Sequence, residues 1–584
     1  EKINIDKPLT LTSEYIFSGD TLDIEQTIID GNLTGSTISI SGINNSVFVK
    51  GFTITGGNGT MADPYDIGED YLFGGGFFIE NTDMVELSNL VISENVITSE
   101  HNSAGGVYAF NTDISIINCN INNNVVNGGS FHGEGAGVFL FNTTANIDQC
   151  KILNNSSSVN YGRGGGVFAN NSNLTVYNSQ INNNSSIESG GIYCLETELE
   201  LDNVVLKENF AQLTSSLYVY NTDTTACIIH NSQFLNNETF NSGGTIALVR
   251  VYADIDNIII DGNDGGLNNG GINCSYSEIT LKHSEITKNT TDSGIGGDAS
   301  GILLYRCDIN LLDVVIDSNV CLTPTHFNSG GAITASASTL NLDSVYMTRN
   351  IADLGGAIYS NQCSVSMKNS LIANNIAYDD GGAIYAFDSD YTIINTTIAD
   401  NAADVASIFS LQNNLLFLNS ILWNPDETEI YYYADNVDES YSDFAFTNVR
   451  GMAENIALNN NGDLNWIEGN LNQNPLFNDI ENLDYSLMET SLAIDAGTAF
   501  FELNGEIIID YNSNEYYGMR PDMGAYEYDP LTRVSNELTD NSNLRVFPNP
   551  CADNLNIIVA EREKKWIRIY DLKGQLVYTQ SLAN

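Results

Sequence analysis

Four aspartates at matching places in the repeats are the residues of this chain best suited to chemistry: Asp298, Asp353, Asp379 and Asp404, with Asn328 in the repeat between the first two. Each lies three residues before the second residue of a small-residue pair. If the repeats stack as neighbouring strands, these carboxylates recur about 4.8 Å apart. They are interpreted as solvated turn acids, as a Ca²⁺ site, or as paired acids for glycoside hydrolysis. We carry weak Ca²⁺ binding forward as the prediction to test, and no other cofactor is expected.

A second column alternates in charge. Glu134, Arg163 and Glu188 occupy the same place in three consecutive repeats. Opposite charges at this spacing predict a surface ion-pair network, in which each exposed pair contributes less than about 1 kcal/mol. Binding of a ligand by the three side chains is the alternative interpretation.

Groups for acid–base catalysis are not gathered in one place. A lyase needs a base beside its substrate, but Arg163, Arg250, Arg306 and Arg349 are scattered through the repeats. The histidines are equally dispersed: His101, His132, His230, His283 and His326. The sequence therefore favours a binding protein over an enzyme. The exposed run Tyr431 to Tyr433 is interpreted as an edge cap of the core, with a sugar-stacking surface as the alternative.

Two cysteines are expected to lie one above the other. Cys119 and Cys150 each lie five residues before an asparagine that recurs in the repeats. We interpret them as small, reduced core residues. A disulfide between neighbouring turns is the alternative in an oxidising compartment.

The elements that must position these side chains are short repeats with a period of 25 to 31 residues. A small-residue pair followed by alternating apolar residues recurs, as in Gly165-Gly166-Val167-Phe168 and Gly355-Gly356-Ala357-Ile358. Between these pairs an apolar residue stands three before an asparagine, as in Ile181/Asn184 and Ile316/Asn319. The period-2 runs between them predict two or three short strands per repeat. We therefore predict an all-β, single-stranded, right-handed parallel β-helix.

The recurring asparagines have a physical role in such a fold. At a tight corner, asparagine tolerates the left-handed backbone region, and stacked amides about 4.8 Å apart can hydrogen-bond from turn to turn. We expect these residues to form a structural ladder and to take no part in catalysis.

Composition excludes several classes of function. With 21 basic and 74 acidic residues, the net charge is −53, so nucleic acid would be repelled. No stretch has the roughly 18 consecutive apolar residues of a membrane span, and no transmembrane segment is expected. The chain has 50 glycines and few helix formers, so long helices are not expected.

The two alternating motifs resemble the repeat of polymorphic outer membrane proteins, a β-helix family of bacterial surface proteins. The resemblance covers about Gly75 to Asn424. Downstream, Ser491-Leu492-Ala493-Ile494-Asp495-Ala496-Gly497 and Asp522-Met523-Gly524-Ala525-Tyr526-Glu527 resemble the closing segment of choice-of-anchor β-helix proteins. That resemblance implies a C-terminal cap.

The end of the chain carries a third resemblance. Leu544 to Pro550, with its Phe547-Pro548-Asn549-Pro550, and Ile569-Tyr570-Asp571-Leu572-Lys573-Gly574 resemble the type A sorting domain of the Bacteroidetes type IX secretion system. The resemblance implies a small β-sandwich, export across the outer membrane, and the secretion machinery as a partner. The family normally continues through further strands after the Gly574 turn, so an incomplete domain is expected.

These observations predict the following organisation: β-helix 1–430, with irregular turns 1–74 and regular repeats 75–424, closing segment 431–528, linker 529–543, and incomplete sorting domain 544–584. The expected function is adhesion or glycan binding outside the outer membrane, by a secreted or cell-surface protein. An extracellular glycan or another host or cell-surface ligand is the expected partner. A polysaccharide lyase or glycoside hydrolase acting on such a glycan is the alternative.

Overall fold

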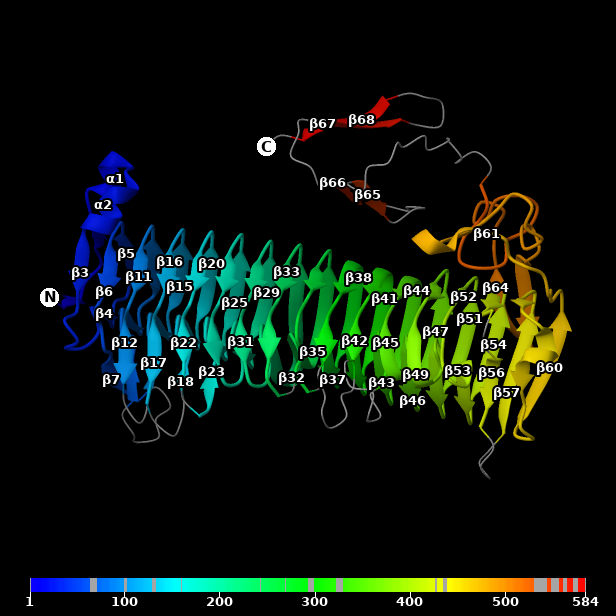
Figure 1. Cartoon of the computed structure of the whole chain (residues 1–584). Helices are drawn as coiled ribbons and strands as arrows, with labels where there is room; N and C mark the ends of the chain where they lie inside the picture. Colours follow the sequence, from blue (N-terminus) through cyan, green and yellow to red (C-terminus); the bar gives the residue numbers. More distant parts are fainter. Residues whose placement is uncertain are drawn as a thin grey trace. The chain divides into compact units, whose positions relative to one another are not determined.

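The computed structural model describes most of the chain and places it in two units, Glu1–Tyr528 and Asp529–Asn584. The described residues are 2–63, 71–98, 102–128, 133–158, 160–241, 243–267, 269–291, 299–321, 329–425, 428–433 and 439–529, with the strands of the second unit. The first unit is a parallel β-helix whose turns follow one another from the blue to the yellow end of Figure 1. The predicted all-β parallel β-helix is confirmed.

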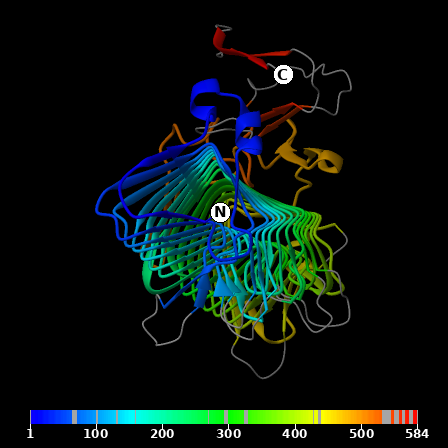
Figure 2. The ribbon, with the colours of Figure 1, turned by 90° about the vertical axis from the view of Figure 1, so that its left-hand side faces the viewer.

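One turn illustrates the plan. β24 (Val167–Asn170), β25 (Asn173–Tyr177) and β26 (Gln180–Asn182) form three faces, and the short β27 (Ser185–Ser186) leads back to the first face. The next turn repeats the plan 25 residues later, with Val167 beside Ile192 and Ile181 beside Leu206 in parallel register. Seen along the axis in Figure 2, the strands of successive turns line up behind one another.

The first face is a continuous row of parallel strands: β1 (Ile3–Ile5), β4 (Ile38–Ser41), β9 (Phe77–Glu80), β14 (Val107–Phe110), β19 (Val138–Phe141), β24, β28 (Ile192–Leu195), β32 (Leu217–His230), β35 (Ile246–Asp256), β37 (Ile272–Ser275), β40 (Ile302–Tyr305), β43 (Ile333–Ser336), β46 (Ile358–Asn361), β50 (Ile384–Phe387), β53 (Ala406–Leu411), β56 (Thr428–Tyr432) and β59 (Ile456–Ala457). The strands β32 and β35 continue onto the second face without a break.

The other two faces have the same construction. The second face contains β2 (Thr10–Thr12), β5 (Ser46–Lys50), β10 (Met84–Ser88), β15 (Asp113–Ile117), β20 (Thr144–Asp148), β25, β29 (Glu198–Asp202), β47 (Ser364–Lys368), β51 (Asp390–Ile394), β54 (Asn414–Leu418), β57 (Ser440–Ala445) and β60 (Gly462–Glu468). The third contains β3 (Ile28–Asp30), β6 (Thr53–Thr55), β11 (Val91–Ser93), β16 (Asn120–Asn122), β21 (Lys151–Leu153), β26, β30 (Val205–Lys207), β33 (Gln233–Leu235), β36 (Ile259–Asp261), β48 (Leu371–Ala373), β52 (Thr397–Ala399), β55 (Ile421–Trp423) and β58 (Asn448–Val449). Both faces share β38 (Glu278–Thr287), β41 (Asp308–Asp317) and β44 (Thr339–Thr348).

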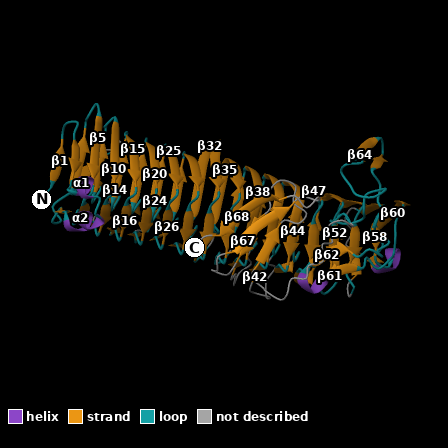
Figure 3. Cartoon of the chain, turned by 90° about the horizontal axis from the view of Figure 1, so that it is seen from above, coloured by secondary structure: helices purple, strands orange, loops and turns teal. Residues whose placement is uncertain are grey.

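Short strands follow the third face and form two further rows. One row contains β12 (Val96–Thr98), β17 (Val125–Asn127), β22 (Ser156–Ser157), β27, β31 (Phe210–Ala211) and β34 (Glu238–Thr239). The other contains β39 (Thr290–Thr291), β42 (Val320–Cys321), β45 (Ile351–Leu354) and β49 (Ile376–Asp380). Figure 3 shows how far strands dominate the chain over helices.

The core lies inside the solenoid because side chains alternate along each strand. In β25, Leu174 and Val176 are buried while Asn173 is exposed. The inward positions of successive turns stack in columns of apolar residues, such as Ile181 and Leu206, which are 0% exposed.

Most turns bend at three corners, and at these corners a residue with positive φ is followed by a buried residue. In the turn that contains β24, Asn171, Asn178 and Asn183 have φ of 48°, 48° and 56°. The residue that follows each of them is buried and points inward, and at the third corner this residue is the ladder asparagine Asn184. The expectation that the ladder asparagine itself adopts the left-handed conformation is therefore wrong. The preceding, more exposed residue makes the bend, which leaves the ladder side chain free to stack.

The asparagine ladder is confirmed. Asn155 donates from its backbone N–H and from Nδ2 to Oδ1 of Asn184, at 2.9 and 3.0 Å, and its Nδ2 also donates to the carbonyl oxygen of Ile121 at 2.9 Å. The pattern continues to Asn424, where the carboxylate of Glu429 takes the place of the next amide and accepts bonds of 2.9 and 2.8 Å.

Strands outside the solenoid cover part of the first face. They are β7 (Thr60–Ala62), β8 (Tyr71–Phe73), β13 (Asn102–Ser103), β18 (Gly133–Glu134) and β23 (Gly162–Arg163). Beneath them the outward rings of Phe78, Tyr108, Phe139 and Phe168 stack with centroids 5.1 to 5.4 Å apart. These rings are 5% exposed or less, so this stack is a second, smaller core.

The solenoid extends further than the expected boundary at residue 430. Parallel pairing continues through β56, β57 and β59 to β60, which ends at Glu468. The repeat motif is lost after Asn424, but the inward ring of Phe444 still stacks between Phe417 and Trp466, with centroids 4.9 and 4.4 Å apart. Apolar packing therefore sustains the last turns without the motif.

The segment after the solenoid lies along the sides of the late turns (Figure 1). It contains the η2 helix (Ile480–Asn482) and the hairpins of β61 (Phe477–Asp479) with β62 (Asp484–Leu487) and β63 (Phe500–Leu503) with β64 (Glu506–Asp510). Tyr485 packs on Leu371 and Ala399, and its hydroxyl donates to Asp400 at 2.9 Å. This segment therefore covers part of the outer surface of these turns.

The remaining elements are short. The helices α1 (Tyr15–Ser18) and α2 (Thr21–Gln26) lie near the N-terminus, and the η1 helix (Met452–Asn455) lies between the last turns. In the second unit, β65 (Leu544–Phe547) pairs antiparallel with β66 (Asn556–Val559), and β67 (Lys565–Tyr570) pairs with β68 (Leu576–Leu582).

Candidate functional site

A row of aromatic side chains lies on the outer side of the first face in its late turns. Tyr359, Tyr385, Phe409 and Tyr431 are in register on β46, β50, β53 and β56. Their ring centroids are 5.3, 4.6 and 5.5 Å apart, with interplanar angles of 7°, 2° and 20°. Tyr433 adds a tilted ring 5.8 Å from Phe409. We call these five residues the aromatic stripe.

The aromatic stripe differs from the covered stack of the early turns in its access to solvent. Tyr359, Tyr385 and Tyr431 are half-buried, and Tyr433 is 38% exposed, whereas Phe409 is buried beneath it. Burial raises the pKa of Tyr385 to about 12, and the nearby Tyr359 and Asp380 reinforce the shift. The Tyr385 hydroxyl therefore stays protonated at neutral pH, and it can both donate and accept hydrogen bonds.

Acidic side chains border the aromatic stripe. The backbone N–H of Asp404 donates to the carbonyl oxygen of Asp379 at 2.9 Å, so these two residues lie on neighbouring turns, as predicted. Asp380 directly follows Asp379, and burial together with the charges of Asp379 and Asp404 raises its pKa. Among the described residues, no hydrogen-bond partner reaches its buried Oδ1. We call Asp379, Asp380 and Asp404 the acidic group.

The structure brings together only part of the predicted aspartate column. Asp353 lies in β45, one turn earlier, and is 3% exposed. Asp298 is outside the described residues. Within the described ranges, no three His, Cys, Asp or Glu side chains converge in a way that would hold a metal ion. Calcium binding by the four aspartates stays a prediction. Sequence reasoning missed Asp380, although it directly follows Asp379.

The charged column of the early turns forms the expected ion pairs, but it is less exposed than predicted. Nε of Arg163 lies 2.7 Å from the Glu188 carboxylate, and its Nη1 lies 3.5 Å from that of Glu134, which is 3% exposed. The guanidinium also lies 5.4 Å from the ring centroid of Tyr193. This network holds β18 and β23 on the first face.

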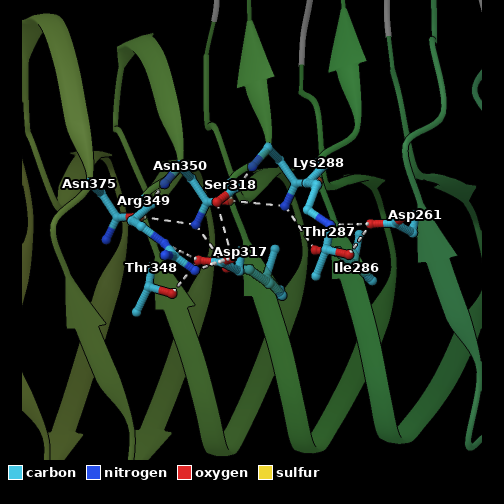
Figure 4. Close-up of polar contacts among 12 residues, drawn as sticks. Asp261, Ile286, Thr287, Lys288, Asp317, Ser318, Thr348, Arg349, Asn350 and Asn375 are labelled. Atoms are coloured by element: carbon cyan, nitrogen blue, oxygen red, sulfur yellow. Dashed lines mark hydrogen bonds and ion pairs between the residues drawn. The ribbon is translucent and has the colours of Figure 1, made fainter. Parts of the chain in front are cut away.

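Other ion pairs connect turns at the third corner, as Figure 4 shows. Asp317 accepts from Nε and Nη2 of Arg349 at 2.8 and 2.6 Å, and from the Thr348 hydroxyl at 2.6 Å. One pair of turns earlier, Lys288 and Thr287 contact Asp261 in the same way, at 3.3 and 2.7 Å. Because Arg349 and Lys288 pair with aspartates of the neighbouring turn, we infer that these two cations stabilise the solenoid.

The two cysteines lie one above the other, as predicted. The backbone N–H of Cys119 lies 3.5 Å from Sγ of Cys150, and both are buried free thiols. Burial raises the pKa of the Cys119 thiol, so it stays protonated. Their redox state in the exported protein stays a prediction.

Comparison with known proteins identifies the end of the chain. Residues 545–584 match the family described as the secretion system C-terminal sorting domain. The chain is therefore a protein that the type IX secretion system exports to the cell surface or the extracellular space. The secretion machinery is one of its partners. Within the described residues, none of the helices combines the length and the apolar character of a membrane span.

The likeness of the whole chain to solved structures is weak. No curated protein sequence matches the chain. Among solved structures, it is similar to the crystal structure of pectate lyase Pel9A, at 12% sequence identity and a TM-score of 0.29, over 62% of this chain and 88% of that one. A likeness of this degree supports no statement about activity. The resemblances to polymorphic outer membrane proteins and to choice-of-anchor proteins stay predictions.

Proposed function

We propose that this secreted β-helix binds an extracellular glycan through the aromatic stripe and acts in adhesion. The stripe itself carries the proposal, because it places half-buried tyrosines at the same position of successive turns. Tyr359 and Tyr385 lie one strand spacing of about 4.8 Å apart, and Tyr431 lies two turns beyond Tyr385 because Phe409 occupies the turn between them. The tyrosine hydroxyls can pair with sugar hydroxyls. The ring edges and the tilted Tyr433 add apolar contact for the carbon side of a sugar ring.

The acidic group supports the same role. Asp379 and Asp404 are exposed, and an ionised carboxylate accepts hydrogen bonds from sugar hydroxyls. Because the turns stack in register, a polymer that lies along the first face would meet similar groups at each turn. A cell-surface protein with such a face can hold its ligand at several points at once, which suits adhesion.

Hydrolysis or lyase cleavage of the bound glycan is the alternative. Its support is the half-buried carboxyl of Asp380, whose pKa is raised by burial and by the charges of Asp379 and Asp404. Carboxyls whose environments separate their pKa values are the pattern of a general acid beside a base.

A glycan array with the full chain tests the proposed function. We expect binding to one class of glycan, and we expect Tyr359→Ala with Tyr385→Ala to weaken it at least about tenfold. Tyr517→Ala is the control because Tyr517 is 55% exposed and lies away from the first-face strands. Equal binding by the stripe variant and the control would exclude the stripe. Release of reducing ends or of unsaturated products would favour the enzymatic alternative.

A further inference from the structure

Two arginines that are far apart in the sequence meet around one tyrosine at the corner between the first and second faces. Arg250, Tyr276 and Arg306 directly follow the first-face residues Val249, Ser275 and Tyr305, which are in register on three successive turns. The guanidinium carbons of Arg250 and Arg306 lie 5.8 and 5.7 Å from the ring centroid of Tyr276. The ring is therefore held between the two cations.

Neighbouring tyrosines complete a surface. Arg306 also lies 5.2 Å from the ring centroid of Tyr305, which meets Tyr276 edge-on at 5.4 Å. Tyr252, Tyr276 and Tyr305 are 54%, 45% and 41% exposed, and both arginines are exposed. We call Arg250, Tyr252, Tyr276, Tyr305 and Arg306 the arginine–tyrosine patch.

The backbone at this corner does not favour these residue types. Arg250, Tyr276 and Arg306 have φ of 57°, 54° and 53°, a region that bulky side chains seldom adopt. Equivalent places in other turns carry Asn111, Asn142 or other small and polar residues. Three successive turns therefore carry, at this corner, residues that the positive-φ backbone does not favour. This indicates that the contacts of these side chains have a role of their own.

Arg250 and Arg306 differ from other arginines of the solenoid in the groups that they contact. Arg163 and Arg349 are both held by carboxylates of neighbouring turns. Within the described part of the chain, Arg250 and Arg306 have no ion pair, and aromatic rings support them instead. A guanidinium held on a ring keeps its fork of N–H donors available for a carboxylate or a similar planar anion.

We propose that the arginine–tyrosine patch binds the carboxylates of an acidic polysaccharide. The two guanidiniums lie two turns apart, or about 10 Å, so they would engage separate carboxylates of one polymer. Tyr276 between them, with Tyr252 and Tyr305 beside them, offers surface to the sugar rings. The proposal takes glycan binding from the proposed function and adds the charge of the glycan.

The overall charge of −53 opposes an anionic ligand at long range but does not prevent contact. At physiological ionic strength the Debye length is about 8 Å, so distant carboxylates are screened. Near the patch, the exposed Asp254 is paired with Lys282 at 3.1 Å and with His230 at 3.6 Å. The exposed Glu278 and Asp308 are in register with Tyr252 on the next two turns, so they are the local charges that oppose an anionic ligand. The two guanidiniums, which have no ion pair among the described residues, supply the attraction.

Titration of the full chain with polygalacturonate and with neutral dextran tests this site. We expect saturable binding of polygalacturonate that is weakened at least about tenfold by Arg250→Gln with Arg306→Gln. The control, Lys7→Gln with Lys151→Gln, removes two exposed charges elsewhere and should bind as the original chain does. Arg250→Lys with Arg306→Lys keeps the charge but loses the fork, and should recover only part of the affinity.

Several results would overturn the proposal. The arginine–tyrosine patch is not the binding site if the original chain does not bind polygalacturonate, or if Arg250→Gln with Arg306→Gln binds it unchanged. The same conclusion follows if the control, Lys7→Gln with Lys151→Gln, weakens binding equally. Binding of neutral glycans alone would agree with the proposed function, glycan binding, and would contradict carboxylate binding by the arginine–tyrosine patch. Polygalacturonate binding that is lost in Arg250→Gln with Arg306→Gln but complete in Tyr359→Ala with Tyr385→Ala would support the arginine–tyrosine patch as the binding site. It would contradict the proposal that the aromatic stripe binds the glycan. Unchanged thermal unfolding of each variant verifies that it folds.

Discussion

At the scale of single residues, the ladder shows how a polar side chain can serve as a core residue. Asn289, Asn319 and Asn350 are 0% exposed, yet their amides are paired in both directions along the solenoid. Asn319 receives two bonds at Oδ1 from Asn289 and makes three to Asn350 and Ile286. Removal of one amide therefore leaves buried donors and acceptors of both neighbours without partners.

The ladder predicts the cost of a single truncation. Asn319→Ala should lower the free energy of unfolding by about 1–3 kcal/mol, because it leaves buried polar groups unsatisfied. Denaturant unfolding measures this change. Asn341→Ala is the control, since Asn341 is exposed on β44 and bonds only at the surface, and it should change stability by less than about 0.5 kcal/mol. Equal midpoints for the two variants would refute the structural role of the ladder.

The acids of the late turns give a prediction about calcium. Millimolar Ca²⁺ should raise the unfolding temperature of the full chain, because carboxylate oxygens repeated at the turn spacing bind it weakly, with dissociation constants of about 10⁻⁴ to 10⁻³ M. Asp353→Asn with Asp379→Asn should remove most of that rise. The matched variant Asp388→Asn with Asp390→Asn alters two acids of one later turn and should keep the rise. The same calcium effect in both double variants would mean that the column consists of solvated turn acids.

At the scale of elements, the repeats were predictable and their coverings were not. The pairing of Ile181 with Asn184 already indicates an inward apolar residue and a corner. The resemblance predicts a closing segment, but the side of the solenoid that it covers could be found only from a change in the outward residues of the third face. Early turns carry polar Asn120 and Asn122 there, whereas late turns carry Leu371 and Ala373, which the segment buries.

The candidate sites were predictable in part, for a related reason. Asp379 and Asp404 follow from alignment of the repeats, because few residues separate each from its small-residue pair. Arg250 and Arg306 looked scattered, because unequal turn lengths hide that both occupy the same corner. Only the register of the first-face strands shows that Tyr276 lies between them. Side-chain direction at a corner depends on backbone conformation, which a period alone does not give.

The closing segment contains carboxyls that should respond to pH. Oδ1 of Asp522 accepts from the backbone N–H of Asp495 at 2.7 Å, and the Glu527 carboxyl accepts from the N–H groups of Asp522 and Tyr517 at 2.9 and 3.1 Å. Burial raises the pKa of Asp522 to about 6, and burial with the charge of Asp522 raises that of Glu527 to about 7. Both values exceed those of the unfolded chain, so the folded state binds more protons between about pH 4 and 7.

This difference has a definite sign. The stabilising contribution of Asp522 and Glu527 is complete below about pH 4 and is lost as the pH rises through 6 to 7. Glu527→Gln should therefore raise the unfolding temperature at pH 8 and change it little at pH 5. Scanning calorimetry at the two values checks this, with Glu506→Gln as the control because Glu506 is an exposed acid of β64. A gain that is no larger at pH 8 than at pH 5 would contradict the assignment.

At the scale of the whole molecule, charge is divided unevenly between the two units. Asp529–Asn584 has seven basic and seven acidic residues, so the 14 basic and 67 acidic residues of Glu1–Tyr528 carry the entire charge of −53. Stacked turns bring some of these acids directly opposite each other. Glu278 and Asp308, the first residues of β38 and β41, are exposed and paired in register. The solenoid therefore folds against its own electrostatic repulsion.

Salt should relieve this repulsion and stabilise the solenoid. Raising NaCl from about 0.01 to 1 M shortens the Debye length from about 30 to 3 Å, so the unfolding temperature of the full chain should rise. Glu278→Gln should raise that temperature at low salt, because it removes one of two opposed like charges, and this gain should shrink at 1 M. Glu198→Gln is the matched control, since Glu198 begins β29 at the equivalent position but lies opposite the uncharged Asn173. If both variants gain equally at low salt, net charge acts as a whole and the opposed pair adds no repulsion of its own.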